Sequence, residues 1–296
     1  MIDPRLEKYR ASGKFELSSI VSLFTTLIGI TLIAIFYAYL SAVISWPLSK
    51  PLFLLVVLFV AVKLTNFVVI RGKVRSNGVA LLFGAILGFC LLYVNWVAFV
   101  YFLSNDLPAA SSSQASSAAI TFQIFQLVSF AETELLKNTT DLFGITLSPL
   151  ILVSVWIGEA VLIVMVPALF AFVISSQRAF CENCQDWMAE EEPIIAFYYD
   201  EAERLKREFL LGSHGFMEEA KAIFNAPMQN YFVLRAEVCE SCNDNFVIRL
   251  FEVEKESDLD KAHEKAFTEK MIATRPYYQH FSLIKAQFPV PEELVD

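Results

Sequence analysis

The sequence predicts an α-helical membrane bundle of four transmembrane helices, followed by a small α+β cytoplasmic domain that contains a zinc-knuckle β-hairpin. Three observations support this prediction. The 296 residues are 56% hydrophobic with a mean hydropathy of +0.51, which is too apolar for an ordinary soluble domain. Apolar residues concentrate before residue 175, whereas most acidic residues follow it, and two Cys-x-x-Cys pairs lie in that acidic half. We therefore expect a membrane domain at residues 1–175 and a zinc-ribbon-like cytoplasmic domain at residues 176–296.

Four apolar runs are long enough to cross a hydrocarbon core of about 30 Å at about 1.5 Å per residue. They are Ile20–Ile44, Leu52–Ile70, Val79–Leu103 and Leu150–Ile174. No small-residue cleavage site follows the first run at the distance typical of a signal peptide. We therefore expect the first run to stay in the protein as an uncleaved span.

The distribution of basic residues predicts the orientation of these spans. An even number of spans places both termini on the same side of the membrane. The short loop between the second and third spans contains Arg71, Lys73 and Arg75 and no acidic residue, whereas the opposite segments contain only Lys50 and Lys137. Basic loops are retained on the cytoplasmic side, so both termini are expected in the cytoplasm.

The outer loop, residues 104–149, has two parts of different composition. Ala109–Ala119 is rich in Ser and Ala and resembles a flexible tether. Ile120–Leu136 places its apolar residues on one helical face and its charged residues toward one end, which predicts an amphipathic helix. The pattern fits packing on the protein's own helices and binding to the membrane surface equally well.

Two charged residues interrupt the apolar spans at similar depth. Lys63 lies in the second span and Glu159 in the fourth. A charge at membrane depth costs at least about 2.5 kcal/mol, so it normally faces a partner or water. We expect an intramembrane ion pair between these two residues, and the alternative is a pathway for a proton or an ion. Asn66 and Asn95 fit two roles equally well: they extend the polar patch, or they form ordinary hydrogen bonds between helices.

The third span also carries a pattern of small residues. Gly84 and Gly88 are separated by three residues, and this spacing lets a neighbouring helix approach closely. Such patterns are common in apolar segments, and they usually indicate packing within one molecule.

The two cysteine pairs predict a structural metal site. Cys181 and Cys184 follow the last span by a few residues, and Cys239 and Cys242 lie inside the β-rich segment Tyr231–Val253. A two-residue gap lets a tight turn aim both thiolates at one tetrahedral ion, so two such pairs are typical of structural zinc. The second pair is expected in the turn of a hairpin. The segment between the two pairs is long, so further helices or strands must be inserted in the chain between the two halves of the site.

The rest of the acidic half predicts a small set of helices. Charge placement and apolar spacing favour helices at Tyr198–Leu211, Phe216–Phe224 and Asp258–Ile272. The tail Phe281–Phe288 is expected to return as an edge strand that ends before the prolines that follow it.

The chain lacks the motifs that would name a reaction. It contains no glycine-rich phosphate loop, no His-Glu-x-x-His motif and no Gly-x-Ser-x-Gly elbow, which favours a role other than catalysis. The three histidines, His214, His263 and His280, are widely spaced and are expected at the surface. The net charge of −9 argues against broad binding of nucleic acid.

Four short motifs give the chain a resemblance to a known group of proteins. They are Tyr9–Phe15, Tyr37–Leu40, Gly72–Arg75 and Leu92–Trp96. They resemble a family of uncharacterised bacterial multi-pass membrane proteins with a cytoplasmic cysteine-pair domain. The resemblance implies a bacterial inner membrane and the four-span layout. It implies no activity and no functional residues.

Together these features predict a membrane-anchored interaction or assembly module whose cytoplasmic domain is stabilised by structural zinc. Its expected partners are the lipid bilayer, a protein bound through the cytoplasmic domain and a second copy of the chain. One alternative is a transporter or channel subunit centred on Lys63 and Glu159. Another is a thiol redox protein that uses the same cysteines, which would need one exposed pair with a low thiol pKa.

Overall fold

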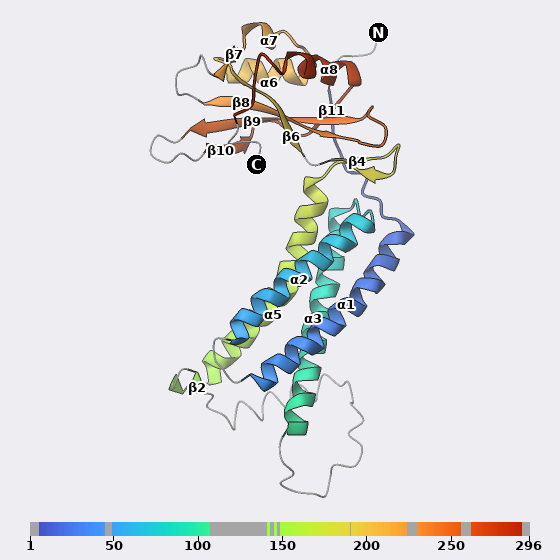
Figure 1. The fold of residues 1–296 in the computed structure, drawn as a ribbon, viewed down its shortest axis with the longest axis vertical. Helices are drawn as coiled ribbons and strands as arrows, with labels where there is room; N and C mark the ends of the chain where they lie inside the picture. Colours follow the sequence, from blue (N-terminus) through green and yellow to red (C-terminus); the bar gives the residue numbers. More distant parts are fainter. Residues whose placement is uncertain are drawn as a thin grey trace, which may run out of the picture. The chain divides into compact units, whose positions relative to one another are not determined.

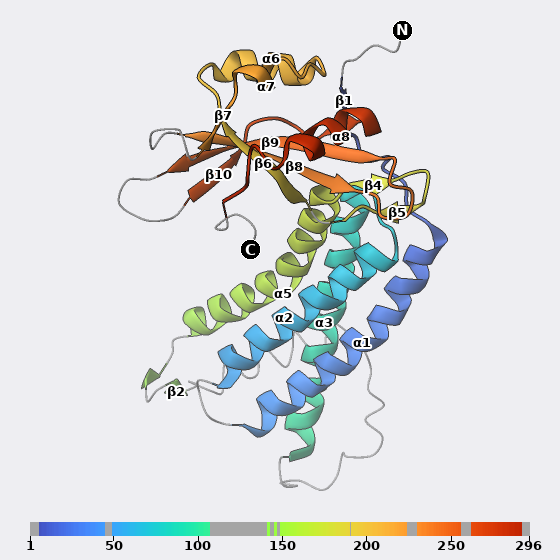
Figure 2. The same ribbon diagram turned by 45° about the horizontal axis from the view of Figure 1, so that its top comes forward.

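The computed structural model describes most of the chain and divides it into two compact units. The residues described are 6–44, 49–106, 141–142, 145–146, 149–189, 191–223, 230–255 and 262–291. One unit is Ser12–Gln177, and the other combines Met1–Ala11 with Arg178–Asp296 (Figures 1 and 2). The structure thus groups the N-terminal residues with the C-terminal unit, whereas the sequence predicts that they belong to the membrane domain. The amphipathic helix expected at Ile120–Leu136 lies outside the described residues.

The first unit contains four helices that are long and apolar enough to cross a membrane. They are α1 (Leu17–Val43), α2 (Ser49–Arg71), α3 (Asn77–Asp106) and α5 (Pro149–Gln177), and two short strands, β2 (Asp141–Leu142) and β3 (Ile145–Thr146), pair before α5. The helices match the four predicted spans to within a few residues at most ends, which confirms a four-span membrane protein. Lipid contains no water to bond backbone groups, so helices satisfy this requirement within each span.

The closest helix contact joins α3 to α5, and glycines permit it. A Cβ atom at Gly84 would lie 2.5 Å from the backbone oxygen of Pro167, and one at Gly88 would lie 2.6 Å from that of Ile163. Both distances are too short for any side chain larger than hydrogen, and backbone cannot move aside as a flexible side chain can. The small-residue pattern therefore acts within the molecule, as expected.

The loop between α2 and α3 is fixed by the start of α1 and the end of α5. Arg75 is 4% exposed, and its guanidinium donates to Glu16 Oε1 at 3.2 Å. The Arg75 backbone N–H donates to the Lys14 carbonyl at 3.1 Å, and Ser175 Oγ donates to the Val74 carbonyl at 3.2 Å. One of the basic residues that predicted the orientation is therefore buried and ion-paired within this unit.

The second unit is built on one antiparallel sheet of seven strands. Its strands are β1 (Glu7–Lys8), β6 (Glu192–Tyr198), β7 (Lys221–Ala222), β8 (Tyr231–Val238), β9 (Phe246–Lys255), β10 (Ala262–Ala266) and β11 (Met271–Ala273). The order is β1-β11-β9-β8-β6-β7, and β10 pairs with part of β9. The N-terminal strand β1 thus joins a sheet whose other strands follow the last span, which explains the division into units.

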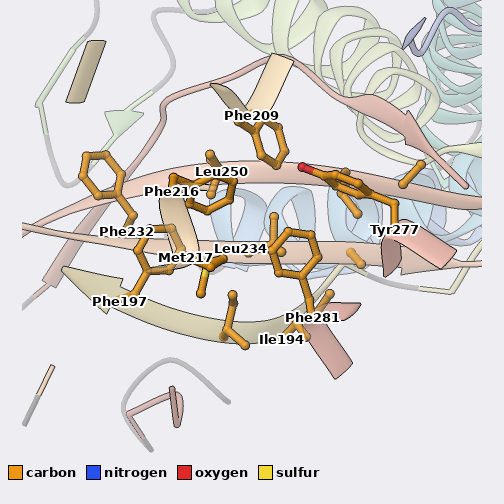
Figure 3. Packing of buried hydrophobic residues seen from close by; sticks show 14 of the residues in the cluster. Ile194, Phe197, Phe209, Phe216, Met217, Phe232, Leu234, Leu250, Tyr277 and Phe281 are labelled. Carbon is orange, nitrogen blue, oxygen red and sulfur yellow. The ribbon is translucent and has the colours of Figure 1, made fainter. Parts of the chain in front are cut away.

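Three helices cover one face of this sheet: α6 (Ala202–Leu210), α7 (Phe216–Glu219) and α8 (Arg275–Ile284) (Figures 1 and 2). Phe209 of α6, Phe216 of α7 and Phe281 of α8 are each fully buried, and they pack over Leu234 and Leu250 of the central strands (Figure 3). Burying an aromatic or aliphatic side chain of this size contributes about 1.5–3 kcal/mol, so this layer is the main core of the unit.

Two secondary-structure predictions for this unit were wrong. The segment predicted as a helix at Asp258–Ile272 contains β10 and the start of β11, because pairing with β9 outweighs the helix propensity of its charged residues. The tail predicted as an edge strand at Phe281–Phe288 begins inside α8, where Tyr277 and Phe281 lie one turn apart and both are buried. Strand β6 was not predicted, and the helix expected from Tyr198 begins only at Ala202.

The predicted helix at Phe216–Phe224 is a single turn that gives way to β7. The histidine prediction also needs correction, since His214 and His280 are half-buried rather than on the open surface. Their rings lie 4.1 Å apart between centroids, and His214 also stacks on Tyr277 at 4.3 Å. Burial lowers the pKa of His214, and the neighbouring His280 lowers it further. This pair packs α8 against the segment before α7.

Candidate metal centre

Each cysteine pair lies at a tight turn between two paired strands. Cys181 ends β4 (Phe180–Cys181), which pairs with β5 (Asp186–Trp187), and the second pair occupies the turn between β8 and β9, as predicted. The residue after each pair has a positive φ, 54° at Gln185 and 51° at Asn243. This left-handed residue reverses the chain, so both thiols of a pair project to the same side.

The four thiols converge on one point. The sulfur atoms of Cys181, Cys184, Cys239 and Cys242 all lie within 4.8 Å of one another, and Cys181 Sγ is 3.9 Å from Cys242 Sγ. Zinc–sulfur bonds of about 2.3 Å in a tetrahedron would set the sulfurs about 3.8 Å apart. Cys181 and Cys239 are 1% exposed, and the other two are half-buried. The cluster therefore fits one tetrahedral metal ion and could hold it in a closed site.

Backbone groups favour the thiolate form at one of these positions. The N–H groups of Asp244 and Asn245 donate to Cys242 and lower the pKa of its thiol to about 7. Burial raises the pKa of Cys239, and a hydrogen bond to Cys242 raises the pKa of Cys184. A cysteine binds a metal as the thiolate, so binding of an ion to the cluster would release the protons of these thiols.

The side chain of Asn245 adds a further donor to the sulfurs. Its amide Nδ2 lies 3.0 Å from Cys181 Sγ and 3.8 Å from Cys242 Sγ, so it contacts one cysteine from each turn. Donors of this kind orient metal ligands and balance the charge of a thiolate cluster. Asn245 thus connects the two halves of the site from within the second turn.

A buried carboxylate holds the first turn beside the sheet. Glu237 of β8 is 2% exposed, and its Oε2 accepts a hydrogen bond from the Ala179 backbone N–H at 2.6 Å. Its other oxygen is bound by the ammonium of Lys270. The chain after the first turn also runs along β8, because the Ala189 N–H donates to the Val238 carbonyl at 2.9 Å. These bonds place two cysteine pairs that are distant in sequence beside each other.

The N-terminal segment completes this support. The hydroxyl of Tyr9 accepts a hydrogen bond from the Phe180 backbone N–H at 2.9 Å, next to the first cysteine. The Tyr9 backbone N–H donates to the Lys270 carbonyl at 2.9 Å. Sequence reasoning missed Tyr9, Glu237 and Asn245 as parts of the site. The one available signal was Glu237, a charged residue in a strand of mostly apolar residues.

The pairing expected between Lys63 and Glu159 is not seen among the ion pairs of the described residues. Lys63 is exposed, and its ammonium lies 5.4 Å from the ring centroid of Phe59. Glu159 is half-buried and accepts a hydrogen bond from the Tyr37 hydroxyl at 3.0 Å. Lys63 lies two residues from both Ala61 and Thr65 on the buried face of α2, which is a rotation of about 200°. Equal depth in the membrane therefore did not place the two charges on facing sides.

The four cysteines thus form the candidate site, and Glu159 belongs to a separate polar contact inside the membrane unit. The comparisons with known proteins add no relative. No protein-family model, no curated protein and no solved structure matches the chain. The chain is therefore a four-helix membrane protein whose sheet-containing C-terminal unit carries a cysteine cluster suited to a metal ion.

Proposed function

We propose that the protein is a membrane-anchored interaction or assembly module whose C-terminal unit is stabilised by one structural zinc ion. The observation that supports this most directly is the convergence of four cysteine sulfurs within 4.8 Å. Four thiolates favour zinc over harder ions such as magnesium or calcium, which prefer oxygen ligands. A site with four protein ligands leaves no position for water, so the ion would hold the fold together and would not activate a nucleophile.

The same geometry favours zinc over the redox alternative. A dithiol redox site needs one accessible pair with a reactive thiolate. Here the two pairs share one cluster, and the most ionised thiol, Cys242, contacts cysteines of the other pair. In the reducing cytoplasm, where disulfides are rare, such a cluster is better suited to a metal ion.

The zinc proposal predicts about one zinc ion per chain in the purified protein. The measurement is elemental analysis by plasma mass spectrometry of the full-length protein in detergent, with protein concentration from amino-acid analysis. The matched control is Cys90→Ser, which removes the one cysteine outside the cluster and should leave the zinc content unchanged. Purified protein with no metal, or with iron in place of zinc, would contradict the assignment.

We propose further that the protein lies in a bacterial inner membrane with both termini in the cytoplasm. The basic loop after α2 supports this orientation. Residues 1–11 and 178–296 belong to one compact unit, and a unit that folds in one compartment needs both ends of the helical unit on the same side. The C-terminal unit would then bind a protein partner from the cytoplasm, and a second copy of the chain is one candidate.

The orientation can be tested by labelling added cysteines with a membrane-impermeant maleimide in intact cells. A cysteine at Ser112 should react, and one at Ser257 should react only after the cells are permeabilised, because the loop is exported and the C-terminal unit is not. The unmodified chain gives the background from its own cysteines. The reverse pattern of labelling would refute the proposed topology.

A further inference from the structure

The helical unit buries a small group of polar side chains whose hydrogen-bonding capacity is only partly used. Glu159 is the only acidic residue within the four apolar spans. Its carboxylate Oε1 accepts a hydrogen bond from the Tyr37 hydroxyl at 3.0 Å. Asn95 is 7% exposed, and its amide oxygen is shielded from solvent and has no hydrogen-bond partner among the described residues.

The contacts between helices place these three residues at similar depth. Gly84 and Gly88 of α3 lie against Pro167 and Ile163 of α5, which sets an antiparallel register. Two turns further along α3, Trp96 packs edge-on against Trp156 at 5.3 Å between centroids. Asn95 therefore lies within about one turn of Glu159 along the bundle.

Helix α1 is aligned with α3 by a contact between Thr31 and Cys90 at 3.8 Å. The two helices follow the same direction in a four-span bundle, so Tyr37 lies level with the residues just after Asn95. Tyr37 is 4% exposed, and its side chain is enclosed by the bundle. The polar side chains thus come from three different helices and lie at a similar depth in the bundle.

The Glu159 carboxylate uses little of its capacity to accept hydrogen bonds. An ionised carboxylate offers about four lone-pair sites, and the Tyr37 hydroxyl is the one side-chain donor seen on it among the described residues. The other titratable and charged groups on the neighbouring helices do not pair with Glu159 in the described residues. Lys50 and Lys63 of α2 lie over aromatic rings, Arg71 ends that helix, and the α3 span contributes only Cys90 and Tyr93. Lys50 attracts the Glu159 carboxylate at longer range but forms no ion pair with it among the described residues, and an unpaired carboxylate at membrane depth is costly to keep ionised.

A groove of about 400 Å³ in the membrane unit runs beside this group. It lies between α3 and α5 and is lined by apolar and aromatic side chains, among them Trp96, Trp156 and Ala160. Ala160 follows Glu159 directly, and Trp156 precedes it by one turn. An apolar molecule in the lipid phase can therefore contact the helix positions on either side of Glu159, which is not itself a lining residue.

We propose that Glu159, supported by Tyr37 and Asn95, is a proton-binding site inside the membrane. A proton needs only one carboxylate oxygen, and the protonated carboxyl then becomes a hydrogen-bond donor itself. A cation such as Ca²⁺ would need about six to eight oxygen ligands, which these three side chains do not supply. This site does not depend on the cysteine cluster or on the function proposed for it.

The test uses N,N′-dicyclohexylcarbodiimide, an apolar reagent that reacts with protonated carboxyl groups in lipid. Full-length protein in phospholipid vesicles is treated over a range of pH, and modification of the peptide that contains Glu159 is measured by mass spectrometry. We expect modification of Glu159 that falls by about tenfold per pH unit once the carboxyl ionises. Glu16, which is paired with Arg75 at the end of α1, is the control acid and should stay unmodified.

Tyr37→Phe provides the second readout. It removes a hydrogen bond that stabilises the ionised carboxylate, so the midpoint of the pH profile should move to higher pH. A role of Tyr37 in packing alone would leave that midpoint in place. The proposal is overturned if Glu159 is unmodified at every pH. It is also overturned if sodium ions at fixed pH protect Glu159 from the reagent, because the site would then bind a metal cation.

Discussion

Replacing Cys239 by serine is expected to unfold the C-terminal unit and to leave the four membrane helices inserted. Structural zinc contributes about 10–16 kcal/mol in small zinc domains at neutral pH, and a typical domain is stable by only about 5–15 kcal/mol. Loss of one thiolate from the cluster is therefore expected to remove an amount of binding free energy similar to the whole free energy of unfolding of the unit. The spans satisfy their own backbone groups and do not need the zinc site.

Limited proteolysis of the full-length protein in detergent would measure this effect. The C-terminal unit of Cys239→Ser should be digested rapidly, while the fragment that contains the spans persists. Cys90→Ser is the matched control, because Cys90 lies in α3, outside the cluster. Incubating the native protein with a strong zinc chelator should reproduce the effect, and adding zinc back should reverse it. Unchanged resistance to the protease in Cys239→Ser would refute a structural role for the ion.

Replacing Glu237 by leucine is expected to destabilise the C-terminal unit by about 3–5 kcal/mol. The substitution removes the carboxylate that binds the Lys270 ammonium and the Ala179 N–H in a largely buried setting. Removing one member of a buried ion pair costs far more than removing both, since a lone buried charge is poorly solvated. The double variant Glu237→Leu with Lys270→Met should therefore lose less stability than the sum of the two single variants.

Urea unfolding followed by tryptophan fluorescence would measure the loss. Trp187 reports on the C-terminal unit, since the other tryptophans precede residue 178, and its ring packs against Phe180 beside the first cysteine pair. Asp200→Asn is the control, because the ion pair between Asp200 and Lys221 is largely exposed and should contribute little. A Glu237→Leu midpoint equal to that of the native protein would show that the carboxylate does not hold the site together.

Features with a local signal could be read from the sequence. Four long apolar runs specify four spanning helices, because a bilayer core requires a minimum length of apolar helix. The hairpin around Cys239 and Cys242 follows from two β-rich runs on either side of a polar turn. The short spacing within each cysteine pair likewise predicts that both thiols face one way.

Features that depend on long-range pairing came only from the tertiary structure. The residues of β10 favour a helix locally, and they form a strand because β9 offers an unpaired edge. The N-terminal residues join the C-terminal sheet through β11, although the four spans separate them in the chain. Depth in the membrane could be estimated for Lys63 from the sequence, but the face of the helix that carries it depends on how α2 packs.

The candidate site shows the same division. The sequence by itself determined the four candidate cysteine ligands, because residue type and spacing define which side chains can bind a metal ion. Only the tertiary structure decided that both pairs share one cluster, because Glu237 of β8, Tyr9 after β1 and Asn245 of the second turn bring the two turns together from distant parts of the chain. Hydrogen bonds to a buried carboxylate or a thiol depend on the positions of groups far apart in the chain, and no short sequence pattern encodes those positions.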